Sequence, residues 1–346
     1  MHLLPDLLDR FALNDPLTYL AVFLGLSLLM LWRLESMLDS GLEGTALGTL
    51  LLPYCSGLGN LIFVWLMISR KGDPAEVLTN CLVNNVTNLT LLLGLPALLW
   101  GLAVLPAGKG AANSGKAKAR KPARPAKGGG GDTGAQINRL SLMLTLAAVL
   151  FFTGAVWLLG RDGKLNQTDG FVLIGLFLFW QCVQVFDVLK HNVRQRVSFG
   201  LKFYADALVV LACAYLLYES IDWLVTWLLA QRHGLISRDH LGWLTGWLMV
   251  LPNAVLALYW GWRRRADVVY SSQVGDGHIC IPLCLGLFAL VKPLPMSGFS
   301  NQALLLLLGS AAVQGVFLLV SGGLPRWAGA VLCAAYGWFV YAGLVG

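Results

Sequence analysis

Long apolar segments recur along the whole chain and constrain its fold more than any other feature. A helix that crosses a bilayer needs about 20 mostly apolar residues. We therefore expect ten transmembrane helices, at about residues 17–33, 44–69, 77–105, 138–160, 169–189, 203–230, 241–262, 268–291, 301–321 and 325–345. Hydrophobic residues make up 57% of the chain and charged residues only 12%, which is about half the charge of a soluble domain. The sequence predicts an all-α integral membrane protein embedded in the lipid bilayer.

One polar connection interrupts the apolar pattern. Residues 106–137 are rich in Lys, Arg, Ala, Pro and Gly and show no apolar periodicity, which is typical of a disordered linker. We expect this basic linker to separate a first membrane half, residues 1–105, from a second half, residues 138–346.

The positive charge of the chain is concentrated on one predicted side of the membrane. The net charge is +7, and the loops near 34–43, 106–137, 190–202 and 263–267, with two flanking arginines, hold 16 of the 25 Lys and Arg residues. Such a bias marks the cytoplasmic side, so both termini are expected to face the periplasm or the cell exterior. The distribution indicates membrane topology rather than a nucleic-acid partner. We expect a bacterial inner-membrane protein without a cleaved signal peptide, because acidic residues outnumber basic ones before the first apolar run.

Several chemistries find no support in the residue pattern. The seven cysteines all lie in apolar segments without metal-site spacing, which predicts neither a disulfide framework nor a structural metal site. No nucleotide-binding fingerprint or nucleophile–base set is present, so we expect neither an enzyme nor a cofactor. The nearest candidate pair, His278 and Cys280, lies two residues apart on one helix, and its side chains face different directions.

Two stretches of the chain repeat one pattern, within about residues 44–105 and 241–291. Each has an apolar span with an asparagine, a short charged loop, and a second span that opens with a polar run and closes with Leu-Gly-Leu. Aligning Gly94 with Gly286 gives the pairs Thr79–Ser271, Asn80–Ser272, Asn84–Asp276 and Asn88–Cys280, and Asn60 meets Asn253 after a one-residue slip. The expected topology runs the two stretches in opposite directions. Inverted repeats are typical of secondary transporters, whose substrate site lies near the midplane.

The repeated residues resemble the cation/calcium antiporter superfamily, which includes the sodium/calcium exchangers. Its prokaryotic members have ten spans, with repeats in the second and third and in the seventh and eighth. Each repeat carries a motif like GTSLPE in one helix and GNxxGSNxxN in the next. Here "VLPNA" and "LGNLI" resemble the first motif, with Asn253 and Asn60 at the glutamate positions. The resemblance covers most of the chain, and the degenerate motifs indicate a divergent member.

The second motif is matched more closely in the first repeat. In "TNCLVNNVTN" the residues Asn80, Asn85 and Asn88 coincide with asparagines of the family, and Asn84 takes the place of its serine. In "SSQVGDGHIC", Asp276 stands at the serine position and Cys280 at the final Asn/Asp position.

The resemblance implies a central cation site and an alternating-access mechanism, in which the first and sixth spans slide against the two repeats. The implied cation-binding residues are Asn60, Asn84, Asn88, Asn253 and Asp276, with Thr79, Asn80, Ser271 and Ser272 as nearby oxygen donors. Calcium takes six to eight oxygen ligands and favours carboxylates, but both glutamate positions hold asparagine. One carboxylate with amide and hydroxyl oxygens better suits a monovalent ion, a proton-coupled step or a neutral solute, and of these we expect a monovalent ion, Na⁺ or H⁺. Calcium is disfavoured without being discarded.

Each of these readings has an alternative. The asparagines can serve as interhelical hydrogen bonds, and Asp276 can lie near the cytoplasmic mouth, paired with one of Arg263–Arg265. His278, the one histidine in a predicted span, can carry a proton. The chain can also be a non-transporting membrane scaffold or subunit that kept the exchanger fold. A homo-oligomer and an unknown membrane partner both stay open.

Overall fold

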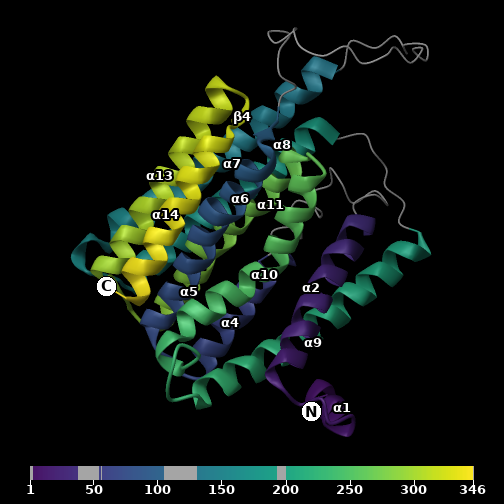
Figure 1. The fold of residues 1–346 in the computed structure, drawn as a ribbon, viewed down its shortest axis with the longest axis vertical. Helices are drawn as coiled ribbons and strands as arrows, with labels where there is room; N and C mark the ends of the chain where they lie inside the picture. The colour runs from purple at the N-terminus through teal and green to yellow at the C-terminus, as the bar shows by residue number, and fades with distance from the viewer. Residues whose placement is uncertain (1–2, 38–53, 56, 105–130, 193–199, 346) are drawn as a thin grey trace.

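The computed structural model describes residues 3–37, 54–55, 57–104, 131–192 and 200–345, and nearly all of them are helical (Figure 1). The α-helices are α1 (Leu3–Arg10), α2 (Pro16–Met37), α4 (Leu58–Ser69), α5 (Pro74–Val86), α6 (Leu92–Trp100), α7 (Gly131–Leu159), α8 (Gln167–Asn192), α9 (Leu201–Ala230), α10 (Leu241–Trp262), α11 (Ala266–Ile279), α12 (Leu285–Val291), α13 (Gly298–Val320) and α14 (Arg326–Leu344). The remaining elements are two π-helical turns, η2 (Thr87–Leu91) and η5 (Cys280–Cys284), two 3₁₀ turns, η3 (Gly160–Asp162) and η4 (Arg238–His240), and four two-residue strands, β1 (Leu102–Ala103), β2 (Lys164–Leu165), β3 (Leu294–Pro295) and β4 (Gly323–Leu324).

The helices confirm the predicted multi-pass membrane architecture. Within the described ranges, nine helical segments are long and apolar enough to cross a bilayer, and α4 is a shorter apolar helix. Each coincides with one of the ten predicted spans. The first part of the second span, up to residue 53, lies outside the described residues. The two segments formed by α5–η2–α6 and α11–η5–α12 are the innermost, with 78% of each apolar window buried.

The two halves are related by matching contacts at opposite ends of the bundle. Strand β1, which follows α6, pairs with β4, which precedes α14. In the same way β3, which follows α12, pairs with β2, which precedes α8. Glycines allow the helices to pack closely, α14 against α6 and α8 against α12. A Cβ added at Gly329 would lie 2.5 Å from the Gly94 carbonyl oxygen, and one added at Gly170 would lie 2.8 Å from the Gly286 carbonyl oxygen. The last helix of each repeat thus makes the same kind of contact with a helix outside the repeats, α6 with α14 and α12 with α8.

Helices α2 and α9 form a pair that lies beside the rest of the bundle (Figure 1). The rings of Tyr19 and Trp223 stack with centroids 3.9 Å apart. Ser220 donates a hydrogen bond to the Tyr19 carbonyl oxygen at 3.0 Å. At the far end of the pair, Arg33 lies 3.3 Å from Asp206. These helices are the first and sixth predicted spans.

A short helix that the sequence analysis does not predict precedes α2. The backbone N–H groups of Leu3 and Leu4, at the start of α1, donate to the carboxylate of Glu219 on α9 at 2.8 and 2.6 Å. Leu4 and Leu8 are buried. A carboxylate at a helix N-terminus satisfies orphan N–H groups and complements the helix dipole, so Glu219 fixes α1 against the bundle.

The predicted linker lies outside the described residues as far as residue 130. Helix α7 begins at Gly131, a few residues before the predicted boundary at 137, at the end of the glycine run.

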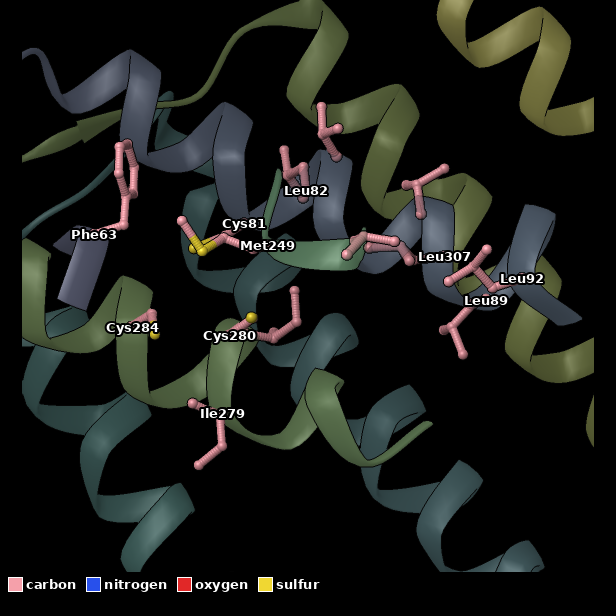
Figure 2. Packing of buried hydrophobic residues seen from close by; sticks show 14 of the residues in the cluster. Phe63, Cys81, Leu82, Leu89, Leu92, Met249, Ile279, Cys280, Cys284 and Leu307 are labelled. Carbon is pink, nitrogen blue, oxygen red and sulfur yellow. The ribbon is translucent and has the colours of Figure 1, made fainter. Parts of the chain in front are cut away.

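The core of the bundle is one apolar cluster that reaches every long helix. Figure 2 shows its centre, where side chains from α5, α10, η5 and α13 meet, among them the sulfur-bearing Cys81, Met249, Cys280 and Cys284. This packing holds the two repeats against each other and frames the polar residues between them.

Candidate cation site

Each innermost span is broken at mid-length by a π-helical turn. The turn η2 runs over Thr87–Leu91 and η5 over Cys280–Cys284, at matching places in the two repeats. In η5, Pro282 has no N–H to donate, which disrupts the regular helix ladder. In η2, the carbonyl oxygen of Leu89 accepts a 2.6 Å bond from Gln314 on α13. Such turns are frequent at functional sites because they redirect side chains.

The five predicted cation-binding residues form one continuous hydrogen-bonded chain. Asn84 Nδ2 donates to Asn60 Oδ1 at 3.4 Å, and Asn88 Nδ2 lies 3.1 Å from Asn84 Oδ1 and 3.3 Å from Asp276 Oδ2. Asn253 Nδ2 also donates to Asp276 Oδ2. All five side chains are buried, with exposures between 0% and 7%. The chain runs from α4 through α5 and η2 to α11 and α10, so it joins both repeats.

Asp276 is a buried carboxylate that makes no ion pair within the described part of the chain. Its Oδ2 atom accepts two amide hydrogen bonds, while its Oδ1 and the Oδ1 atom of Asn88 have no hydrogen-bond partner among the described residues. Arg265, in the preceding loop, pairs instead with Asp267 at 3.1 Å. The alternative in which Asp276 lies shallow and pairs with that loop therefore does not fit the structure. A buried carboxylate with a free acceptor atom can bind a cation or a proton.

A small cavity adjoins this chain on the side of α2 and α9. Its volume is about 30 Å³, which is close to the share of one water molecule in the liquid. Eleven residues line it: Phe23, Ser27, Met30, Leu31, Cys55, Gly59, Asn60, Leu217, Met249, Pro252 and Asn253. The two asparagines that align between the repeats, Asn60 and Asn253, thus both border one small cavity.

The predicted secondary donors lie outside the hydrogen-bonded chain. Asn80 donates to Thr245 on α10 at 2.9 Å, which is an interhelical bond of the kind the alternative reading describes. Thr79 packs beside Gly242 at the start of α10. Ser271 is exposed, and both serines, Ser271 and Ser272, donate to carbonyl oxygens of their own helix at 3.1 Å.

His278 faces away from Asp276, as the two-residue spacing predicts. Its Nε2 atom lies 3.0 Å from the carbonyl oxygen of Thr145 on α7. Its ring packs edge-on against Trp180 and Phe152, with centroids 5.4 and 5.9 Å away. The structure therefore places this candidate proton carrier between α7 and α8, apart from the asparagine chain.

Three further residues lie at the site: Cys280, which the motif alignment named, and Gln273 and Gln314, which the sequence analysis did not single out. Gln273 is fully buried, and its Nε2 atom lies 3.4 Å from the carbonyl oxygen of Asn253. Cys280 donates from its thiol to Asn84 Oδ1 at 3.8 Å. Gln314 holds the η2 turn. A lone polar residue in an apolar stretch, as in "AAVQGVF", is the signal that marks Gln314. In the described ranges, no three His, Cys, Asp or Glu residues are grouped to hold a metal ion.

Comparison with known proteins identifies the architecture. A family model described as sodium/calcium exchanger protein matches residues 16–186. No curated protein matches the sequence significantly. Among solved structures, the H⁺/Ca²⁺ exchanger CAX superposes with a TM-score of 0.66 at 14% identity, over 99% of this chain and 86% of that one. The sodium-calcium exchanger NCX_Mj, soaked with 2.5 mM Na⁺ and 10 mM Sr²⁺, gives 0.63 at 16% identity over 100% of both chains.

The fold thus defines a multi-pass membrane protein of exchanger architecture, built from two inverted repeats. The family model covers residues 16–186, so both the sequence of the first part of the chain and the fold as a whole are similar to the cation/calcium exchanger superfamily. Proteins of this superfamily are transporters rather than enzymes, in agreement with the expectation from the sequence.

Proposed function

We propose that this protein is a secondary-active cation antiporter that exchanges monovalent ions, Na⁺ or H⁺. The site of exchange is formed by Asp276 and the four asparagines hydrogen-bonded in series with it, Asn60, Asn84, Asn88 and Asn253. The similarity to the exchanger superfamily supports antiport. The names of the similar structures describe exchange of Na⁺ or H⁺ against Ca²⁺ in those proteins. The single buried carboxylate carries the argument for a monovalent ion.

Charge balance favours one positive charge at this site. Burying an unpaired charge in a low-dielectric interior is costly, and ionisable groups within the membrane are usually paired. One Na⁺ or one H⁺ at Asp276 gives a neutral site, whereas a divalent ion leaves an excess positive charge. Binding of Na⁺ and H⁺ at the same carboxylate is mutually exclusive, which is the requirement for coupled exchange.

The asparagines supply oxygens that can turn toward an ion. A side-chain amide carries both an acceptor and two donors, and Asn88 and Asn253 direct their N–H groups at Asp276. Rotation of these amides by half a turn presents their oxygens instead. The same groups then stabilise the free carboxylate through N–H bonds and the bound ion through oxygen.

Flux measurements in proteoliposomes test the proposal. Under an imposed sodium gradient and then a proton gradient, we expect labelled Na⁺ flux or proton flux that Asp276→Asn abolishes. The matched control is Asp267→Asn, on the same helix and paired with Arg265, which should retain flux. Sodium-driven calcium uptake would show that the antiport is right and the monovalent preference wrong.

The loss of both family glutamates also motivates a second candidate, a non-transporting scaffold. Here the hydrogen bonds among Asn60, Asn84 and Asn88 serve only to join helices. Folded protein that carries no Na⁺, H⁺ or Ca²⁺ flux in the same vesicles would favour this candidate.

A further inference from the structure

Sulfur atoms are concentrated around the cavity beside the asparagine chain. Met30 from α2, Cys55 from the segment before α4, and Met249 from α10 are three of its eleven lining residues. Met and Cys together make up only 14 of the 346 residues of the chain. The lining is therefore several times richer in sulfur than the chain, and two amide side chains, Asn60 and Asn253, complete its polar part.

The packing brings one of these sulfurs directly against the asparagine helix. A Cβ added at Gly59 would lie 2.6 Å from the Met249 sulfur, so this thioether rests on the backbone next to Asn60. Met30 and Met249 are 3% and 6% exposed. Both side chains are held in the interior, where they line this small cavity.

A second group of sulfurs lies on the other side of Asn84. Cys280 reaches Asn84 Oδ1 at 3.8 Å, and Cys81 and Cys284 are buried in the same part of the core. Figure 2 shows these three cysteines on α5 and η5. Sulfur-bearing side chains therefore lie near both Asn60 and Asn84, and the resembling family has hard carboxylates at the positions of Asn60 and Asn253.

Ligand chemistry indicates which ion such a cavity takes. Thiolate and thioether ligands select soft ions, of which Cu⁺ is the common monovalent one, whereas carboxylates and carbonyls suit Ca²⁺. We propose that the cavity lined by Met30, Cys55 and Met249 binds a soft monovalent metal ion, Cu⁺ or its analogue Ag⁺, as the cargo exchanged against Na⁺ or H⁺ at Asp276. The proposal rests on the proposed antiport and adds a soft cargo to it; Asn253, which lines the cavity and donates to Asp276, links the two positions. One cation moves each way, and no electron is transferred.

Silver binding to the purified full-length protein tests this inference. Ag⁺ is the redox-inert probe, and excess glutathione in the buffer competes with single thiols on the surface. We expect one Ag⁺ per chain to stay bound in the wild type. Met30→Leu/Met249→Leu should lower the affinity by at least about tenfold, the scale at which even outer-shell changes act on metal sites. Leu conserves the volume of Met, and Cys55→Ser provides an independent variant.

Two variants control for binding elsewhere. Met143→Leu, half-buried on α7, and Cys182→Ser, exposed on α8, should bind Ag⁺ as the wild type does. Absence of glutathione-resistant binding in the wild type, or unchanged binding in Met30→Leu/Met249→Leu, overturns the inference. Na⁺ or H⁺ flux sensitive to Asp276→Asn is measured on the same preparations. If that flux persists in either case, the antiport stands while the soft cargo is wrong.

Discussion

Asp276 on α11 and Asn88 in η2 meet at 3.3 Å, carboxylate oxygen to amide nitrogen, across the boundary between the two repeats. Each residue also has one oxygen atom without a partner among the described residues. Asp276 is the one carboxylate among the five hydrogen-bonded site residues. The contact joins it to η2, the π-helical turn between α5 and α6. At the proposed site, a change of the bound ion would therefore act on both repeats at once.

Restoring the family's glutamates should convert the site toward calcium. Asn60→Glu/Asn253→Glu raises the formal charge of the cluster from one carboxylate to three, and carboxylate count tunes calcium affinity. We expect calcium affinity to rise by at least about tenfold, which corresponds to ~1.4 kcal/mol. Labelled calcium binding to purified protein measures it.

The control for this change is Asn60→Gln/Asn253→Gln, which lengthens the side chains equally without adding charge. Equal calcium binding by the Glu and Gln variants would argue that these positions do not face a bound cation.

The close packing of α14 against α6 at Gly329 and Gly94 should make the stability of the protein sensitive to one added methyl group. In Gly329→Ala the new Cβ would meet the Gly94 carbonyl oxygen at 2.5 Å, and overpacking of this kind costs ~1–3 kcal/mol. Thermal unfolding in detergent should show a lower midpoint. Gly337→Ala, on the same helix with nothing described within 4 Å of its Cβ, should unfold like the wild type; equal losses in both would refute the packing argument.

Gln314 should control the shape of η2. Its replacement by Met keeps the length of the side chain but leaves the Leu89 carbonyl without its 2.6 Å donor. Interhelical bonds in membranes are worth ~0.6–2 kcal/mol, so we expect a modest loss of stability with a larger loss of cation flux, because Asn88 lies in the same turn. Gln302→Met, exposed on α13, is the comparison. A stability loss with full flux would mean that η2 is not part of the site.

Glu219 should hold the first turn of α1. In Glu219→Gln one acceptor and the negative charge that face Leu3 and Leu4 are lost, and charge at a helix N-terminus contributes ~0.3–1 kcal/mol, up to ~2 when partly buried. Amide hydrogen exchange over residues 3–10 should accelerate several-fold while the inner spans stay protected. Glu35→Gln, exposed on α2, should leave that exchange unchanged. Unchanged exchange in Glu219→Gln would show that burial of Leu4 and Leu8 alone fixes the helix.

The spans could be predicted because a bilayer requires apolar segments of a fixed length. The two repeats could be predicted because each has an asparagine within an apolar span. Asn60 and Asn253 pointed to two repeats, and the structure places both at one cavity. The orientation of individual side chains could be predicted only where helix geometry decides it, as for His278 against Asp276.

Other features depend on contacts that no local pattern records. The π-helical turn at Thr87–Leu91 contains no proline and is fixed from α13 by Gln314. Helix α1 depends on Glu219, more than 200 positions away. The bonding of Asn80 to Thr245 rather than to the cluster follows from how α5 and α10 pack, which sequence spacing does not give.

The contact between α6 and α14 has a consequence for biogenesis. Strand β1 and the surface of α6 around Gly94 pack against β4 and α14, which come much later in the chain. During synthesis the first membrane half must therefore stay in the bilayer with that surface against lipid until α14 is inserted. A chain truncated before residue 323 would leave this surface of α6 without its partner and should be degraded rather than accumulate as a folded half.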